Sequence, residues 1–403
     1  MESDNESVTS HQTGAASARW LTAARLIDLL RTHPDITRAA AAAELGIGSG
    51  AATDLLARLR RAELVDEVPA PARGRGRPTT LLRPHPRGPL VIAADLGATG
   101  WRVATADVGG APVVEAAASR LHRDPRRVLG DMAEAIRVIQ KRDSSRIRLV
   151  SVAAAGTVSD DRLVQFTPRG WMDVDLSQLT SGLPRRVHLP MSVGNDATLA
   201  GLAEARTGSA RGVGTVLHLI VTTGIGGALI VDGVPTTGAH GAAGEYGHLP
   251  FGDRTQLCAC GAHGCWNLTV AGDALADLRG DPPPRNPVAY AHRLLDRASG
   301  TDASAGHAFT TVARSLGSGI AGLVNVHDPD VVTLGGLASP LRAAATGEFD
   351  SAYLGGLMAF RKNAPPPVLD GIHGDDGPLV GAALLGLDRI TTPDALAQWA
   401  ESS

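Results

Sequence analysis

The three cysteines of this chain lie close together, in the segment Cys-Ala-Cys-Gly-Ala-His-Gly-Cys that runs from Cys258 to Cys265. Thiolates and an imidazole at such short spacing are the soft sulfur and nitrogen ligands of a closed tetrahedral zinc site. With all three thiols used, none is left for a disulfide, which predicts an intracellular protein with a structural metal. The alternative is three free or buried thiols in a loop. Gly261 and Gly264 favour the metal because they supply the tight turns that would fold the thiolates around one ion.

Two histidines compete for the place of the fourth ligand. His248 ends the upstream segment Gly244-Glu-Tyr-Gly-His, whereas His263 lies inside the cysteine loop. His263 would be strained in pointing back at an ion that its own loop surrounds. We therefore predict that zinc is bound by four residues, His248, Cys258, Cys260 and Cys265.

The composition is that of a globular protein with a sizeable core. A length of 403 residues predicts two or three domains, and 43% apolar against 20% charged residues is an ordinary balance. The net charge of −3 argues against attraction of the whole protein to nucleic acid, so DNA binding would need a local patch. No apolar run reaches the roughly 18 residues that span a bilayer. Since the acidic start also lacks the features of a signal peptide, we expect a cytoplasmic protein with no membrane partner.

The N-terminal part has the pattern of a helix-turn-helix. A polar stretch, 1–16, is expected to be disordered, and helical patterning begins at residue 17. Thr37 is a good N-cap for an alanine-rich helix over 38–45. After a glycine turn, Ser49 is expected to cap a third helix that ends near residue 62.

Two short strands, 64–65 and 80–82, can pair after the third helix. The loop between them, Pro69-Ala-Pro-Ala-Arg-Gly-Arg-Gly-Arg-Pro78, would form a wing. Residues 17–88 are therefore predicted to be a winged helix-turn-helix domain.

From residue 89 onward, strand and helix patterns alternate. Two buried strands are each followed by a polar glycine turn and another strand: Asp95-Leu-Gly-Ala-Thr-Gly100 is the first turn, and Thr222-Thr-Gly-Ile-Gly-Gly227 is the second. Repetition of this unit predicts two α/β lobes around a cleft. We place the first lobe at 89–205 and the second, with the zinc site, at 206–403, and we expect the C-terminal helix to pack back on the first lobe.

These motifs resemble the ROK family, named for repressors, open reading frames and kinases. The most specific part is Gly241-Ala-Ala-Gly-Glu-Tyr-Gly-His248 followed by the cysteine cluster. Four further segments support the likeness: Gly194–Ala197, Asp328–Gly336, Gly377–Leu385 and the wing sequence Gly76-Arg-Pro78. The likeness covers nearly the whole chain, from about residue 20 to residue 390.

The resemblance implies an actin- or hexokinase-like (ribonuclease H-like) sugar-kinase fold behind the winged helix-turn-helix. Family members with that N-terminal addition are sugar-responsive transcription regulators. The chain is accordingly interpreted as a regulator, most simply a repressor, of carbohydrate metabolism genes. Its partners would be a double-stranded DNA operator, a sugar or sugar derivative as effector, and further copies of itself in a homodimer or homotetramer. The alternative is an active ATP-dependent sugar kinase.

Four residues resemble those that hold sugar hydroxyls in the family: Asn195, Asp196, Glu245 and His248. The chemistry is suitable because a carboxylate accepts hydrogen bonds from two hydroxyls at once. Glu245 precedes His248 by three residues, so a zinc ion that anchors His248 would also orient Glu245. The alternative for Asn195 and Asp196 is that they only cap the helix that begins there.

The two glycine turns resemble the phosphate loops of the family. The candidate nucleotide-binding residues are Asp95, Gly97 and Thr99 in the first turn and Thr223, Gly224 and Gly226 in the second. Glycine-rich turns let backbone N–H groups approach phosphate oxygens closely. In a kinase, Asp95 would help to hold Mg²⁺ beside ATP, and Asp196 would be the general base. The alternative is that the turns are simply hairpins.

Three positions depart from the family pattern. Arg169 stands where an asparagine is usual in sugar-binding members, Thr222 replaces a glycine of the second phosphate loop, and Asn267 replaces a sugar-contacting glutamate. Together they favour ligand binding over phosphorylation, and the kinase stays the alternative.

The third candidate site is for DNA. The start of the helix after the glycine turn would lie at the major groove, where the nearest residues are Ser49, Gly50, Thr53 and Asp54. In the wing, Arg75-Gly-Arg-Pro78 resembles the core of an AT-hook. Arg75, Gly76 and Arg77 would then enter a narrow A·T minor groove, whose negative potential attracts arginine. The alternative is a solvated basic linker.

Overall fold

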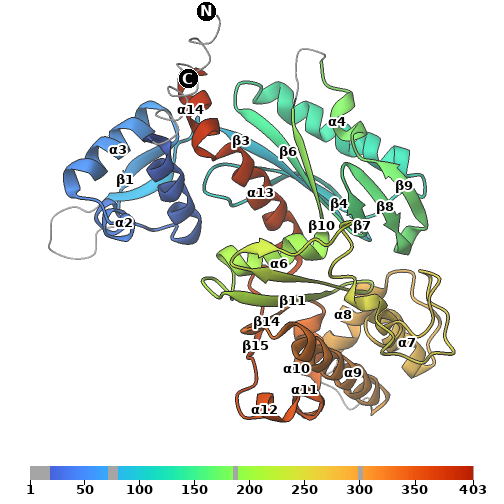
Figure 1. Ribbon diagram of the computed structural model, residues 1–403. Coiled ribbons are helices and arrows are strands. Elements are labelled where there is room, and N and C mark those ends of the chain that lie inside the picture. Colours follow the sequence, from blue (N-terminus) through green and yellow to red (C-terminus); the bar gives the residue numbers. More distant parts are fainter. Residues whose placement is uncertain (1–18, 71–79, 185–188, 298–302, 403) are drawn as a thin grey trace, which may run out of the picture.

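The computed structural model of the protein describes residues 19–402 apart from 71–79, 185–188 and 298–302. The stretch 1–16 and the wing residues Arg75, Gly76 and Arg77 lie outside the described residues. Figure 1 shows a small N-terminal module beside a larger two-lobed body, with the end of the chain returning to the module.

The N-terminal module is built from three helices and one strand pair. A helix over 19–32 comes first, and α2 (Arg38–Leu45) and α3 (Ser49–Arg61) form the helix-turn-helix. The Thr37 side chain caps α2 by accepting a hydrogen bond from the Ala40 N–H. Gly46 ends α2 at a φ of 67°, a left-handed conformation that favours glycine. The prediction that Ser49 caps α3 is wrong: the N-cap is Gly48, and Ser49 is already the first helical residue.

The wing consists of β1 (Val65–Pro69) and β2 (Thr80–Pro84), which pair antiparallel. The core of the module contains Leu59 and Leu82, and both are fully buried. This core also includes Leu396 and Trp399 of the C-terminal helix α14 (Pro393–Ser402). The indole Nε1 of Trp399 donates to the carbonyl of Ala62 at 2.7 Å. The first and last helices of the chain therefore share one core.

The first lobe contains a five-stranded sheet in the order β10-β6-β3-β4-β5. Its strands are β3 (Leu90–Leu96), β4 (Trp101–Ala106), β5 (Val113–Ala118), β6 (Ile147–Ala154) and β10 (Met191–Asn195). β3 pairs antiparallel with β4 and parallel with β6. The lobe also contains α4 (Pro125–Arg142), α5 (Gln178–Ser181) and a small sheet of β7 (Thr157–Ser159), β8 (Arg162–Phe166) and β9 (Trp171–Asp175).

The second lobe repeats this arrangement. Its sheet has the order β13-β12-β11-β14-β15, in which β11 pairs antiparallel with β12 and parallel with β14. The strands are β11 (Thr215–Val221), β12 (Ile225–Val231), β13 (Val234–Pro235), β14 (Val331–Gly336) and β15 (Val368–Asp370). The helices are α7 (Gly272–Arg279), α8 (Pro287–Arg297), α9 (Ala303–His327), α10 (Ala338–Ala344), α11 (Thr346–Gly356) and α12 (Ala359–Lys362). The repeated hairpin with a parallel neighbour is the duplicated sugar-kinase architecture, so the predicted fold class is confirmed.

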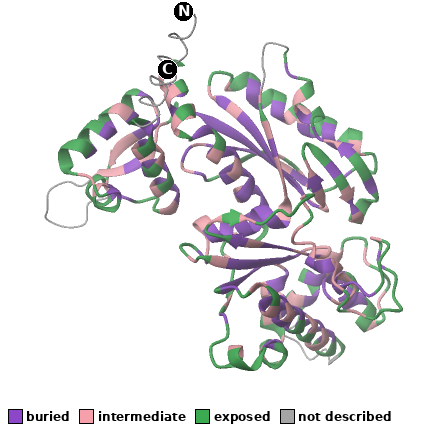
Figure 2. Ribbon diagram, in the orientation of Figure 1, coloured by how far each residue is buried: buried purple, intermediate pink, exposed green. Residues whose placement is uncertain are grey.

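Two helices lie between the sheets (Figure 1). α6 (Asp196–Thr207) contacts β11 and β12, while α13 (Gly377–Ile390) contacts β3 and β6, and the two helices pack on each other. Gly381 permits the crossing, since a Cβ atom there would lie 1.9 Å from the Leu199 carbonyl oxygen. Figure 2 shows that the buried residues follow the two sheets and the faces of these helices. The strand ends that carry Asp95 and Asn195 therefore face the gap between the lobes.

Candidate functional site

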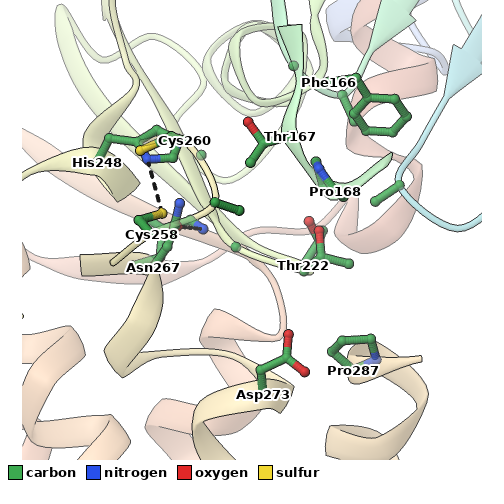
Figure 3. Close-up of a pocket in the computed structure, with 18 of the residues that line it drawn as sticks. Phe166, Thr167, Pro168, Thr222, His248, Cys258, Cys260, Asn267, Asp273 and Pro287 are labelled. Carbon is green, nitrogen blue, oxygen red and sulfur yellow. Dashed lines mark hydrogen bonds between the residues drawn. The ribbon is translucent and has the colours of Figure 1, made fainter. Parts of the chain in front are cut away.

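A cleft of about 1100 Å³ lies between the lobes. Figure 3 shows side chains entering it from several elements, with the Phe166–Pro168 segment on one side and Asp273 and Pro287 on another. Thr222 lies between these two groups, and Asn267 lies beside Cys258. The cleft therefore brings together segments that are widely separated in the chain.

Four side chains at the edge of the cleft form a group that could hold a metal ion. One ligand atom each from His248, Cys258, Cys260 and Cys265 lies within 4.8 Å of all the others. The Sγ of Cys258 is 3.9 Å from Nδ1 of His248, and the sulfurs of Cys260 and Cys265 are 3.6 Å apart. This set of one imidazole and three thiolates suits a four-coordinate soft metal.

The turns of the cysteine segment explain how it closes on itself. Gly261 and Gly264 have φ values of 96° and 70°, which residues with a Cβ atom rarely adopt. His263 is exposed and does not belong to the group of metal-ligand atoms. The imidazole next to the thiols is thus that of His248, the last residue of the short 3₁₀ turn Tyr246–His248.

Glu245 is held between the two lobes. Its Oε1 accepts a hydrogen bond from the Thr157 hydroxyl at 2.8 Å, and its Oε2 lies 3.9 Å from Nε2 of His248. Thr157 belongs to β7 of the first lobe. A metal on the opposite ring nitrogen of His248 would therefore restrain the imidazole that faces Glu245.

Asn195 and Asp196 lie at the N-terminus of α6. The Oδ1 of Asn195 accepts from the Thr198 N–H at 3.0 Å, so Asn195 does cap the helix. Its Nδ2 donates to the Gly156 carbonyl at 2.9 Å. Both residues also line the cleft. Capping and ligand binding are therefore compatible for this pair.

The carboxyl of Asp196 has an unusual proton affinity. Burial, followed by the negative charges of Asp95 and Glu245, raises its pKa to about 7, against the hydrogen bond from the Ala197 N–H. A carboxyl with a pKa near neutrality can exchange a proton with a bound hydroxyl. The position thus combines a helix N-terminus with a proton-accepting group.

Asp95 is already paired. Its Oδ2 accepts from Nη2 of Arg102 at 2.8 Å and from Nε at 3.2 Å, and Arg102 also pairs with Asp376 and donates to the Asp375 carbonyl. Burial raises the pKa of Asp95, and the Arg102 guanidinium opposes that rise. The guanidinium is therefore bound to one oxygen, Oδ2, of the carboxylate that would help to hold Mg²⁺ in a kinase. Sequence reasoning missed Arg102, although a hairpin that closes around residues 97–100 places it directly opposite Asp95.

The predicted phosphate-loop residues are only partly at the cleft. Thr99, Thr223, Gly224 and Gly226 line it, whereas Asp95 and Gly97 are not among its lining residues. Both turns close hairpins, β3–β4 and β11–β12, with hydrogen bonds Gly97 N–H to Gly100 O and Thr222 N–H to Gly224 O. This hairpin geometry is common to both interpretations, the phosphate loop and the simple hairpin.

The three departures from the family pattern all lie at the cleft. Asn267 accepts a hydrogen bond at Oδ1 from the Ile225 N–H, which fixes the second glycine turn to the metal segment. Arg169 follows Pro168 in a 3₁₀ turn and donates from Nε to the Ala98 carbonyl at 3.3 Å. Asn267 therefore holds a turn in this chain, a role that its sequence position did not reveal.

The residues proposed to face DNA share one surface of α3. Ser49, Gly50, Thr53 and Asp54 are exposed, while Ala52, Leu55, Leu56 and Leu59 of the same helix are buried. These four residues therefore face solvent, away from the buried leucines of the helix. Among the residues that the structure describes, no helix is long and apolar enough to cross a membrane.

The duplicated fold and the cleft define a two-lobed protein of the sugar-kinase class. The ROK family profile matches residues 91–389, and the chain belongs to the ROK family.

Its relatives include enzymes and regulators. The chain is 27% identical over 323 residues to a glucokinase of Streptomyces coelicolor, which covers 76% of this chain and 99% of the glucokinase. It is 26% identical over 186 residues to the xylose repressor of Bacillus subtilis, covering 46% of this chain and 47% of the repressor.

Two similar solved structures likewise include one regulator and one enzyme. One is a ROK family transcriptional regulator, a homologue of the E. coli MLC protein, with a TM-score of 0.71 at 20% identity. That likeness covers 96% of this chain and 100% of the regulator, so it extends over the N-terminal module. The other is a ROK glucokinase of Streptomyces griseus in complex with glucose and AMPPNP, with a TM-score of 0.62, 25% identity and coverage of 74% and 99%.

Proposed function

We propose that this protein is a sugar-responsive, DNA-binding transcription regulator, acting as a repressor, with its effector bound in the cleft of the ROK domain. The observation that carries the proposal is the winged helix-turn-helix module attached to a two-lobed sugar-kinase-like body. The fold likeness to a ROK transcriptional regulator spans 96% of the chain, whereas the S. griseus glucokinase covers 74%. A winged helix-turn-helix is a DNA-reading device that a sugar kinase does not need.

The DNA interface consists of the exposed face of α3 and the wing. Ser49, Gly50, Thr53 and Asp54 approach the major groove, and Arg75 and Arg77, on either side of Gly76, contact an adjacent A·T-rich minor groove. A homodimer presents two N-terminal modules to operator half-sites spaced by about one helical turn or a multiple of it.

The effector is a sugar or sugar derivative whose hydroxyls are bound by Asn195, Asp196, Glu245 and His248. The metal is zinc, because one imidazole and three thiolates are its usual structural set. Bound zinc would hold His248 and Glu245 in place and would supply no chemistry of its own. The relatives named for glucose and xylose supply the first probe sugars.

Selection of genomic DNA fragments on the purified protein tests the proposal, followed by affinity measurements with and without D-glucose and D-xylose. The wild type is expected to retain a small set of fragments. Thr53→Glu adds a negative charge to the exposed face of α3 without touching its core, so it should weaken DNA binding by at least about tenfold.

Val138→Glu is the matched control, since Val138 is an exposed residue of α4 in the first lobe. Equal affinities of the two variants for DNA would refute the proposed interface.

A second candidate function is an ATP-dependent sugar kinase, favoured by the pKa of about 7 at Asp196, which suits a general base. The pairing of Arg102 with Asp95 weighs against it, because the guanidinium neutralises the carboxylate that would help to hold Mg²⁺ and binds its Oδ2. A coupled ADP-release assay with a sugar panel separates the two functions. We expect no turnover above background, whereas turnover abolished by Asp196→Asn would establish the kinase.

A further inference from the structure

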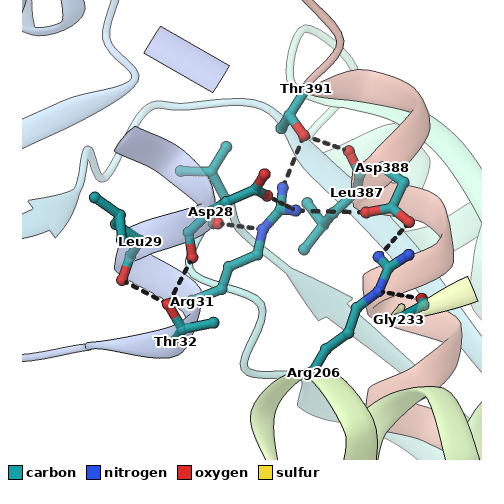
Figure 4. Close-up of polar contacts among 10 residues, drawn as sticks. Asp28, Leu29, Arg31, Thr32, Arg206, Gly233, Leu387, Asp388 and Thr391 are labelled. Carbon is teal, nitrogen blue, oxygen red and sulfur yellow. Dashed lines mark hydrogen bonds and ion pairs between the residues drawn. The ribbon is translucent and has the colours of Figure 1, made fainter. Parts of the chain in front are cut away.

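A buried arginine connects the N-terminal module to the two-lobed body. Arg31 lies near the end of the helix over 19–32, and its side chain is only 4% exposed. Nε donates to the Val108 carbonyl at 3.1 Å, and Nη2 donates to the Thr391 hydroxyl at 2.8 Å. Nη1 donates to Asp28 at 3.0 Å. The guanidinium thus ties the module to the first-lobe turn after β4. It also ties the module to Thr391 at the end of α13, as Figure 4 shows.

One carboxylate joins this arginine to α6. Asp388 of α13 has its Oδ1 3.6 Å from Nη1 of Arg31 and its Oδ2 2.5 Å from Nη1 of Arg206. Arg206 lies in the last turn of α6 and also donates from Nε to the Gly233 carbonyl at 3.0 Å. Figure 4 shows the two guanidiniums on either side of Asp388. A single acidic group is thus shared by the DNA-reading module and the central helix.

A second contact strengthens this connection. Arg211, just after α6, donates to the carbonyl of Thr32 at the end of the module's first helix. The residues that follow α6 therefore contact the same helix end that Arg31 anchors.

The opposite end of α6 is at the cleft. The helix begins with Asp196, capped by Asn195, and its residues from Ala197 to Ala205 are buried throughout. Its twelve residues span about 18 Å. Because a close-packed interior transmits strain, we expect a displacement at Asn195 and Asp196 to be passed along the helix to Arg206.

We infer that the Arg206–Asp388–Arg31 contacts couple the effector site to the DNA-reading module. This inference rests on the proposed function. Movement of α6 on effector binding changes the pairing of Asp388 between Arg206 and Arg31, and this repositions the helix over 19–32. A coupling of this kind is reciprocal, so DNA bound to the module also changes the N-terminus of α6.

Arg206→Gln is the most specific test, because it removes the ion pair between α6 and Asp388 and leaves the contacts of Arg31 in place. Arg31 keeps Asp28, Asp388, Val108 and Thr391 as partners, so the module stays docked. Arg137→Gln is the matched control, since Arg137 forms an exposed pair with Glu134 on α4, outside the junction. Asp388→Asn removes the shared charge and serves as the second variant.

The first measurement is amide hydrogen exchange with and without the DNA fragment selected on the wild type. DNA should change exchange in α6 in the wild type and in Arg137→Gln, and this change should be clearly smaller in Arg206→Gln and Asp388→Asn, in which the contact of Arg211 with Thr32 remains. An identical change in all four proteins, or none in the DNA-bound wild type, would overturn the inference. Failure to select any DNA would instead overturn the proposed function and the inference with it.

The second measurement is the ratio of DNA affinities without and with D-glucose or D-xylose. A useful switch has a ratio of about 5–150, which should fall below about twofold in both junction variants. Their separate affinities for DNA alone and for sugar alone should stay near those of the wild type. If these contacts only stabilise the fold, the junction variants will have a lower melting temperature but an unchanged ratio of DNA affinities. That result would refute the inference.

Discussion

At the residue scale, the metal cluster depends on which imidazole completes it. His248 lies with the three sulfurs, and His263 is exposed outside that group. His248→Ala should therefore weaken zinc binding by at least about tenfold, because it leaves an incomplete tetrahedral set. His263→Ala should retain about one zinc per chain. Metal analysis after dialysis against a weak chelator measures both, and the reverse order would assign the metal to His263.

The carboxyl of Asp196 makes a separate prediction about pH. Its pKa rises from an ordinary value of 3.8 to about 7 in the folded protein, chiefly through burial. Between about pH 4 and pH 7 the folded state keeps a proton that the unfolded state has released. This group therefore lowers the free energy of unfolding as pH rises through that window, and its penalty is complete above about pH 7.

Asp196→Asn removes this effect. The difference between the melting temperatures, variant minus wild type, should increase by a few degrees from pH 5 to pH 8. Thermal unfolding of both proteins in each buffer isolates the contribution, because all other titrating groups are shared. A difference that stays constant across this range would contradict the raised pKa.

At the element scale, the C-terminal helix α14 completes the core of the N-terminal module. Leu396 is fully buried there, beside Trp399. Leu396→Ala should lower the free energy of unfolding of the module by about 2–5 kcal/mol, because it reduces apolar burial and leaves a cavity behind. Leu21→Ala is the control, since Leu21 lies in the module's first helix and is 57% exposed.

Chemical denaturation followed by tryptophan fluorescence measures both leucine variants. The Leu21→Ala change should stay within about 0.5 kcal/mol of the wild type. Equal stabilities of the two variants would show that α14 contributes little to the module.

At the scale of the whole molecule, the formal net charge of −3 opposes DNA binding except at a local basic surface. DNA affinity should therefore fall by at least about tenfold between 50 and 200 mM salt as arginines displace counterions. Replacing Arg75 and Arg77 by glutamine should reduce the slope of log affinity against log salt by about 0.9 for each DNA phosphate that is no longer neutralised. Fluorescence anisotropy with the selected fragment at several salt concentrations measures these affinities. A salt-independent affinity would exclude the electrostatic interface.

The main elements were predictable because their signals are local. Thr37 caps the start of α2 and Gly46 ends it, so residues within the segment 37–46 determine both ends of that helix. The strands around each glycine turn are short apolar runs, and duplication of that unit indicated the two-lobed fold. The predicted start of α3 is off by one residue because glycine is also an acceptable N-cap, only a few tenths of a kcal/mol less favourable than serine, and Gly48 takes that place.

By itself the sequence determined that three thiols gather in one place, because residues 258–265 cannot separate far and their glycines turn the chain. It also determined the family, through motifs of consecutive residues. Only the tertiary structure decided that Asn267 holds a glycine turn and that Arg31 meets Thr391, 360 residues away. Such contacts depend on how packed helices and sheets bring distant side chains together, and no local pattern of residue types encodes that packing.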